Sequence, residues 1–173
     1  MSNPKTVNEL KALHPVLARH EGVWDGMYRH YDADGNKIDE HKSRLLCRFP
    51  DMGDYLYHQT NYYSWEDGKT ETRDFPAEIR DGRLRWDNEF IQGWAADLKL
   101  DTNNRTTVLN WTRTGDPDLY LYEMIQISDC GTKRARTWHW FKNDELFSRT
   151  LVDERKISDE WKNYETRENT NAV

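Results

Sequence analysis

The chain has 173 residues, enough for one domain with a substantial buried core. Its net charge of −6 and the lack of a basic block exclude a surface that tracks nucleic-acid phosphates. Only 36% of the residues are hydrophobic and 32% are charged, but eight Trp, nine Tyr and five Phe argue against disorder. Each aromatic side chain can bury about 150–250 Å², so a few of them can build a core.

The sequence contains no run of about 18 apolar residues, so we expect no membrane-spanning helix. The first residues have no apolar core of a secretory signal, and we expect a cytoplasmic protein. Cys47 and Cys130 lack the spacing of metal ligands and are expected to be free thiols in a reducing compartment.

Residues 5–21 form the only segment with a helical pattern. Apolar residues recur there at helical spacing: Val7, Leu10, Leu13 and Leu17. Pro15 is expected to divide the segment into two short helices, because proline removes a hydrogen-bond donor and clashes with the preceding turn. Such a segment could cover one end of a barrel.

From Gly22 onward, short aromatic and β-branched stretches alternate with turn pairs such as Asp34-Gly35 and Asn143-Asp144. About ten strands are predicted, near residues 22–31, 37–49, 55–65, 69–79, 83–88, 90–99, 105–114, 119–128, 133–142 and 145–156. Strands joined in sequence order favour an all-β, antiparallel up-and-down barrel, since closure removes the exposed edges. We expect a helical cap at 1–21, a barrel at 22–157 and a polar, frayed tail at 158–173.

The first strand begins Gly22-Val23-Trp24, directly after the helical segment. Gly-x-Trp at this position resembles the signature of the lipocalins and the wider calycin superfamily. The resemblance implies that Trp24 closes the floor of the barrel against an arginine from a late strand, and Arg149 or Arg155 could supply it. It also implies a cavity that binds a small molecule.

The run from Trp24 to Tyr28, with Tyr31 to Gly35 after it, also resembles a little-characterised lipocalin-like family known from cyanobacterial proteins of unknown function. Ten strands would favour the fatty-acid-binding or nitrobindin-like branches of the superfamily. The second of these binds haem, but the sequence has no specific haem motif, and any of its six His could be an axial ligand. We therefore expect no cofactor.

The length of the turns decides which residues of the last strands share a face. A two-residue turn at Cys130-Gly131 places Glu123 opposite Trp138, and one at Asn143-Asp144 places Arg149 opposite Trp138. One face then carries Glu123, Arg136, Trp138, Trp140, Phe147 and Arg149. These charges could form an internal salt bridge or anchor a ligand carboxylate, phenolate or enolate. A three-residue first turn would instead join His139 to Glu123 as an acid–base pair.

The stretch from Tyr55 to Trp65 carries hydrogen-bonding groups on both faces, which suits a wet cavity. It contributes His58, a candidate for catalysis with Glu123 and His139. The candidate ligand-binding residues are Trp24, Tyr28, Gln59, Asn61, Tyr63, Trp86, Trp94, Tyr122, Arg136, Trp138 and Arg149. The interior placement of His41 is plausible, without an assigned role. No His spacing indicates a metal site, and no phosphate loop or nucleophile elbow is present.

Two functions follow from these observations. The first is binding of a small apolar or aromatic molecule in the barrel cavity, because indole and phenol walls accept flat rings. The alternative is a cofactor-independent lyase, isomerase or cyclase that uses Glu, His and Tyr on an aromatic substrate. A third, weaker one is a structural or partner-binding role. Aromatic residues on both faces of several strands also suggest a homodimer.

Overall fold

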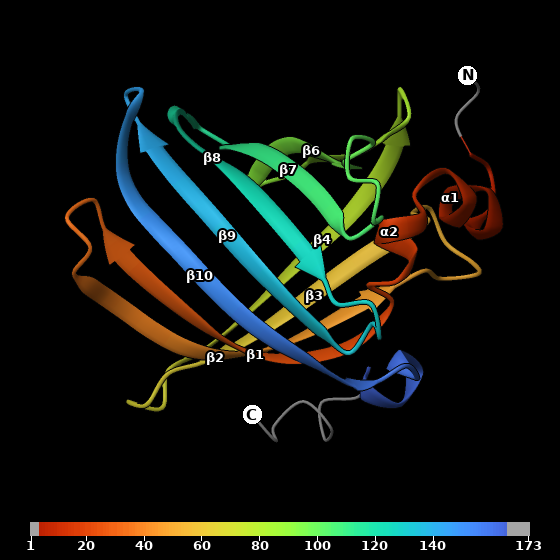
Figure 1. The fold of residues 1–173 in the computed structure, drawn as a ribbon, viewed down its shortest axis with the longest axis horizontal. Coiled ribbons are helices and arrows are strands. Elements are labelled where there is room, and N and C mark those ends of the chain that lie inside the picture. The colour runs from red at the N-terminus through yellow and green to blue at the C-terminus, as the bar shows by residue number, and fades with distance from the viewer. Residues whose placement is uncertain (1–3, 166–173) are drawn as a thin grey trace.

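The computed structural model describes residues 4–165. Ten antiparallel strands follow one another in sequence order and close into a barrel, with β1 hydrogen-bonded to both β2 and β10 (Figure 1). The strands are β1 Gly22–Asp32, β2 Lys37–Arg48, β3 Tyr57–Ser64, β4 Thr70–Arg80, β5 Arg83–Asp87, β6 Ile91–Asp97, β7 Thr106–Arg113, β8 Asp116–Ile127, β9 Lys133–Lys142 and β10 Glu145–Ser158. The predicted ten-stranded barrel with a short N-terminal helical segment is confirmed.

Tight turns produce this meander. Asn143 and Asp144 both have positive φ, 52° and 63°, and they connect β9 to β10 as the predicted two-residue turn. The expected turn at residues 115–117 is shorter than predicted. Asp116 already belongs to β8 and pairs with Arg113 of β7, so Gly115 with φ 81° carries the reversal.

Two short helices lie at one end of the barrel, α1 Val7–Leu13 and α2 Pro15–Ala18 (Figure 1). Pro15 occupies the first turn of α2, where its missing N–H costs nothing. The carboxylate of Asp97 accepts the free N–H groups of Val16 and Leu17 at 2.7 and 3.1 Å. This buried cap fixes α2 onto β6, and the predicted division of the helix at Pro15 is confirmed.

The floor of the barrel is built around Trp24, which is fully buried. Its indole Nε1 donates to the carbonyl of His20 at 2.8 Å. The guanidinium of Arg134, on β9, lies 4.4 Å from the centre of its ring. The expected partners were wrong: Arg155 is exposed on β10, and Arg149 contacts the carbonyl of Ala33. The arginine that closes the floor of the barrel therefore comes from β9, one strand before the predicted β10.

The register of the last strands agrees with the sequence analysis at one turn and differs at the other. Glu123 pairs with Trp138 and Ile125 with Arg136, as the two-residue turn predicted. Between β9 and β10, however, the register shifts at Leu146/Ser148, so Trp138 faces Thr150 and Arg149 pairs with His139. This β-bulge turns the Arg149 side chain to the outer face, because one extra residue inverts the alternation.

The described residues after β10 pack against the outside of the barrel. A 3-10 helix, η1, covers Trp161–Tyr164. Trp161 is buried against Val23 and Leu46 on the outside of the barrel, and its Nε1 donates to Glu21 at 3.2 Å. The expectation of a frayed tail from 158 is therefore wrong for these residues, because one indole supplies enough apolar surface to fix the segment. Residues 166–173 lie outside the described residues.

Among residues 4–165, no helix is long and apolar enough to cross a membrane.

Cys47 is buried and Cys130 is exposed, and both are free thiols. Hydrogen bonds from Ser128 and Thr132 lower the pKa of Cys130 to about 7.

Candidate functional site

The barrel encloses a cavity of about 340 Å³ that reaches from Leu17 of α2 to side chains at the opposite rim. Its walls come from the inner faces of nearly all strands, where every second residue points inward. Ten of the 27 lining residues are Phe, Tyr or Trp: Tyr28, Tyr57, Tyr63, Trp65, Phe75, Trp86, Phe90, Trp111, Trp138 and Trp140. The volume lies near the lower end of small-molecule sites, about 300–1,000 Å³, so the cavity suits a compact ligand.

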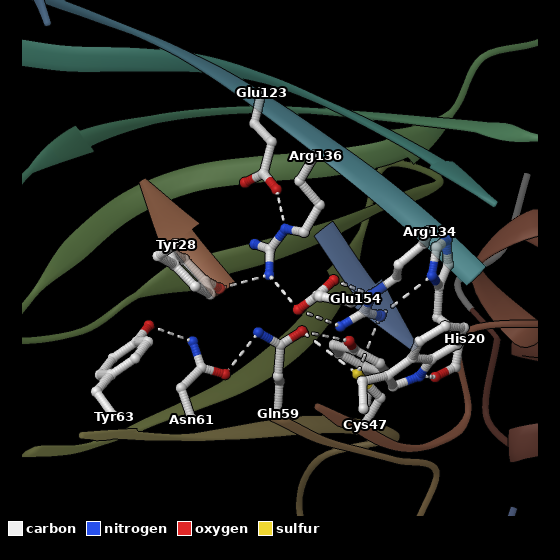
Figure 2. A network of polar contacts seen from close by, with 12 residues as sticks. His20, Tyr28, Cys47, Gln59, Asn61, Tyr63, Glu123, Arg134, Arg136 and Glu154 are labelled. Carbon is white, nitrogen blue, oxygen red and sulfur yellow. Dashed lines mark hydrogen bonds and ion pairs between the residues drawn. The ribbon is translucent and has the colours of Figure 1, made fainter. Parts of the chain in front are cut away.

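A row of hydrogen-bonded polar side chains follows the inner face of β3 (Figure 2). Tyr57 donates to Gln59 at 3.0 Å, Gln59 donates to Asn61 at 2.8 Å, and Asn61 donates to the hydroxyl of Tyr63 at 2.7 Å. Strand alternation places these four residues on one face, as the sequence predicted. Because each group is held by its neighbour, the row forms a fixed polar wall.

Opposite this wall, four buried charges alternate in sign (Figure 2). Arg136 donates from Nε to Glu123 at 2.5 Å, and its Nη1 lies 3.7 Å from Glu154. Glu154 also pairs with Arg134, which donates to it from Nε and Nη2. The two carboxylates and two guanidinium groups sum to zero charge, which is how these groups can remain ionised out of water.

Arg136 also connects the charged row to the aromatic wall. Its Nη1 donates to the hydroxyl of Tyr28 at 2.8 Å. Burial lowers the pKa of Arg136, but Glu123, Tyr28 and Glu154 outweigh it and raise that pKa well above the usual value. Burial raises the pKa of Tyr28 well above its usual value, although Arg136 opposes this. Tyr28 is therefore a neutral phenol at pH 7.

The cavity also contains a guanidinium without a carboxylate partner. Among the described residues, Arg113 forms no ion pair. Its guanidinium carbon lies 5.7 Å from the centre of the Trp111 ring. Burial, followed by repulsion from Arg73, lowers the pKa of Arg113, although the carboxylates of Glu71 and Asp116 oppose this. Arg73 itself is paired with Glu71 at 2.6 Å. The cavity lining thus carries excess positive charge at this point.

A second polar group lies at the rim, where β1 meets β2. His30, Asp39 and His41 all line the cavity, and their ligand-type atoms lie within 4.8 Å of one another. The Nδ1 of His41 is 2.8 Å from Asp39 Oδ2, and the Nε2 of His30 is 4.0 Å from the same oxygen. The three residues thus form one compact group of two imidazoles and a carboxylate.

Eight of the candidate catalytic and ligand-binding residues line the cavity: Tyr28, Gln59, Asn61, Tyr63, Trp86, Glu123, Arg136 and Trp138. Trp24 lies in the floor, beneath the charged row. The structure therefore brings together most of the expected ligand-binding set, and the role of each residue in binding stays a prediction.

The other named residues lie outside the cavity. His139 is exposed and pairs with Tyr122, which is 55% exposed, so the three-residue turn that would join His139 to Glu123 does not occur. His58 faces outward beside Asp74, with Nε2 3.3 Å from Oδ1. Trp94 lies under the guanidinium of Arg83 at 4.8 Å on the outer face of β6. Arg149 is outside because of the bulge in β10.

Four polar residues that line the cavity were not predicted from the sequence: His30, Asp39, Arg73 and Arg113. The inward alternation of residues 107, 109, 111 and 113 could have found Arg113, since Trp111 is an evident core residue. His30 and Asp39 could not be paired in this way. The register shifts between His30 and Tyr31, which alternation alone does not reveal.

No protein-family model matches the sequence, and the search of curated proteins found no match. Solved structures do resemble it. A protein of unknown function from the DUF3598 family of Nostoc punctiforme matches with a TM-score of 0.61 and 17% identity, over 82% of this chain and 49% of that chain. The chain thus spans about half the length of the Nostoc protein.

The S-type phycobiliprotein lyase CPES from Guillardia theta matches with a TM-score of 0.60 and 13% identity, over 87% of this chain and 92% of that chain. At these identities the likeness concerns the fold. The fold and the site together define a closed, ten-stranded antiparallel barrel with an internal cavity. Within that class, the chain shares its barrel with a cyanobacterial protein of unknown function, as the first strand suggested.

Proposed function

We propose that the barrel binds a small, flat, aromatic or apolar molecule that carries an anionic group. The observation that carries this proposal is the unpaired guanidinium of Arg113 inside a cavity with aromatic walls. Aromatic rings favour flat apolar ligands, because stacking and edge contacts add to the burial of their surface. The proposal extends the binding function expected from the sequence by assigning the anionic group of the ligand to Arg113.

The charge follows from desolvation. Arg113 is half-buried, and Arg73 adds a second positive charge near it. A half-buried charge without an ion-pair partner is unfavourable in such a site, and a carboxylate, sulfonate or phenolate from the ligand would neutralise it. Arg136 is a weaker candidate for this anchor in the free protein, since Glu123, Glu154 and Tyr28 already occupy its donors.

The test uses two fluorescent probes with similar rings. 1-Anilinonaphthalene-8-sulfonate is anionic, and N-phenyl-1-naphthylamine lacks the sulfonate. We expect saturable 1:1 binding of the anionic probe, with weaker binding of the neutral one. In Arg113→Gln the Kd of the anionic probe should rise about 10–100-fold, the range expected for loss of a charge-assisted hydrogen bond of about 1.5–3 kcal/mol. The Kd of the neutral probe should change less than about twofold.

Arg83→Gln is the matched control, because Arg83 stacks on Trp94 outside the cavity. It should leave the Kd of both probes unchanged. Leu109→Trp fills the cavity from β7 and should reduce the affinity for both probes. If Arg113→Gln weakens the binding of both probes equally, the proposal that the ligand carries an anionic group is contradicted. If Leu109→Trp binds both probes with unchanged affinity, the probes bind outside the cavity, which contradicts the proposed site.

A cofactor-independent isomerase is the second candidate. It is favoured by Glu123 and Tyr28, which line one cavity and contact the same guanidinium. A carboxylate there could remove a proton from a ligand C–H, and the phenol could return one to another carbon, which leaves the ligand's composition unchanged. The proton on Glu123 would then pass through water to the phenolate of Tyr28 and restore both groups. The likeness to a phycobiliprotein lyase supports a reactive rather than purely storing barrel.

The isomerase proposal predicts that a bound carbon acid, such as a 2-naphthyl ketone, exchanges its α-hydrogen for deuterium in D2O. Proton NMR should show the signal fading faster with protein than without it, and Glu123→Gln should remove the acceleration. Exchange that persists in Glu123→Gln would assign it to another group. No acceleration with the native protein would leave binding as the function.

The other expectations remain predictions. A homodimer would use outer aromatic faces such as that of Tyr120, Tyr122 and Phe141, where Tyr120 stacks on Phe141 at 5.2 Å. The cytoplasmic location and the absence of a nucleic-acid or membrane partner rest on the sequence alone.

A further inference from the structure

The group at the rim results from strand pairing. His30 on β1 lies directly opposite Asp39 on β2, and His41 follows two residues later on the same face. Cross-strand partners and residues two apart are the nearest side-chain neighbours in a sheet. The register shifts directly after this pair, because Tyr31 lies opposite Lys37. Ile38 has no partner on β1, and its side chain is exposed. The pairing therefore brings two imidazoles and one carboxylate onto a single inner surface.

Neighbouring side chains hold two members of this group in place. Trp65 Nε1 donates to Asp39 Oδ1 at 2.9 Å. Thr150 Oγ1 is 2.8 Å from His30 Nδ1 and also accepts from Trp140 Nε1 at 3.0 Å. In one tautomer of His30 the hydroxyl of Thr150 donates to Nδ1, and Nε2–H points toward Asp39. In the other, His30 Nδ1–H donates to Thr150, and the lone pair of Nε2 is free to bind a metal.

We propose that His30, Asp39 and His41 bind one divalent transition-metal ion of the Zn²⁺ class at the rim of the cavity. Two imidazole nitrogens and a carboxylate oxygen are a donor set that such ions prefer. The contacts of Trp65 and Thr150 are the outer hydrogen bonds that fix ligand orientation at metal sites. The spacing of histidines along the chain did not predict this metal site, because its three ligands meet across a hairpin.

The distances fit a metal site that needs little movement. Zinc bonds of about 2.0–2.1 Å in a tetrahedron separate ligand atoms by about 3.3 Å. The two separations from Asp39 Oδ2, 2.8 Å to His41 and 4.0 Å to His30, lie on either side of that value. If His41 binds through Nδ1, its ring proton moves to Nε2 and the metal replaces the hydrogen bond to Asp39.

The surroundings of the group also suit a bound cation. His41 is buried, and its ring lies 5.3 Å from that of His30, so the two imidazoles already lie side by side. The nearby guanidinium of Arg73 is paired with Glu71 at 2.6 Å, which limits its repulsion of a cation.

Three protein ligands leave a coordination position free, and all three residues line the cavity. A bound ion would thus give a cavity ligand a second anchoring point, at the rim. This proposal does not depend on Arg113 or on the proposed ligand, and the metal and the naphthalene probes are measured separately.

The test is calorimetric titration of chelator-treated protein with ZnCl2. We expect one equivalent to bind, and His30→Gln, His41→Gln and Asp39→Asn should each raise the Kd at least tenfold. His58→Gln is the matched control, since His58 and Asp74 form a single His–Asp pair on the outer face. It should leave the Kd within about twofold.

Circular dichroism, together with binding of the neutral probe, shows whether each variant keeps its barrel. If one variant unfolds, titration of the native protein with CoCl2 supplies the second readout, since a site of three protein ligands should give visible bands of low-symmetry Co²⁺ at one equivalent. Absent binding of Zn²⁺ by native protein overturns the proposal. So does an unchanged Kd in both histidine variants, or a loss of binding in His58→Gln.

Discussion

At the scale of residues, the interior is distinguished by charges that neutralise one another. Glu123, Arg136, Glu154 and Arg134 alternate in sign across β8, β9 and β10. Arg134 additionally covers the ring of Trp24, so it takes part in both ion pairing and packing. Such a row resists the loss of any member, because the remaining charge would be buried without a partner.

Arg134→Met tests this dependence. We expect the free energy of unfolding to fall by about 3–5 kcal/mol, because Glu154 would lose its main partner in a buried site. Urea unfolding followed by circular dichroism measures the change. Arg155→Met, on the exposed face of β10, should change stability by less than about 0.5 kcal/mol. Equal effects of the two substitutions would show that the buried row adds little.

Part of this row was predictable from the sequence. The two-residue turn set Glu123 opposite Trp138, and alternation then placed Arg136 on the same face. Arg149 was assigned to that face and lies outside it, because a bulge near Phe147 inverts the alternation along β10. A bulge depends on local backbone geometry, so the pattern of polar and apolar residues does not predict where it occurs. Arg134, the floor partner of Trp24, was missed for the related reason that the floor depends on strand tilt.

At the scale of elements, the connection between α2 and β1 carries a buried histidine. His20 accepts from Arg134 at its Nδ1, 3.2 Å away, and its Nε2 has no partner among the described residues. Burial lowers the pKa of His20 well below the usual 6.5, and Arg134, Arg136, Lys156 and Arg19 all lower it further. The junction therefore depends on a neutral imidazole.

Stability should fall with acidification for this reason. In the unfolded chain His20 takes up a proton near its usual pKa of 6.5, whereas the folded protein resists protonation. The unfolded state then binds more protons, so the stabilisation is complete above pH 6.5 and is lost as the pH falls below it. The slope approaches about 1.4 kcal/mol per pH unit for each such group.

Urea unfolding between about pH 5 and pH 7 measures the slope while most carboxylates remain ionised. His20→Gln should reduce it, and His139→Gln, at an exposed position, should leave it unchanged. An identical slope in native protein and His20→Gln would assign the dependence to other histidines. His14, between α1 and α2, is a second such group, since it is buried and burial lowers its pKa.

The elements themselves were largely predictable. All ten strands were expected within a few residues, because aromatic and β-branched stretches were separated by turn pairs with fixed backbone requirements. Pro15 divided the helical segment as expected. The contact of Asp97 with α2 was not predictable, since it joins residues 81 positions apart through the closed barrel.

At the scale of the whole molecule, the cavity has three chemically different levels. The charged row and Trp24 lie near the helical end, and aromatic side chains surround the middle. His30, Asp39 and His41 lie at the rim, near the hairpin that joins β1 to β2 at the end away from the helices (Figure 1). The sequence predicted the barrel and its aromatic interior. It did not predict the order of these levels, which depends on how far each strand is staggered relative to the next.

The seam of the barrel has a consequence for protein synthesis. β1 forms hydrogen bonds with β10, pairing Val23 with Ser158 and Asp32 with Ser148. A growing polypeptide on the ribosome therefore carries β1 with one side unsatisfied until the last strand has left the exit tunnel. During that interval the nascent sheet has an open edge and no enclosed interior, so a chaperone that shields β1 would protect it from aggregation.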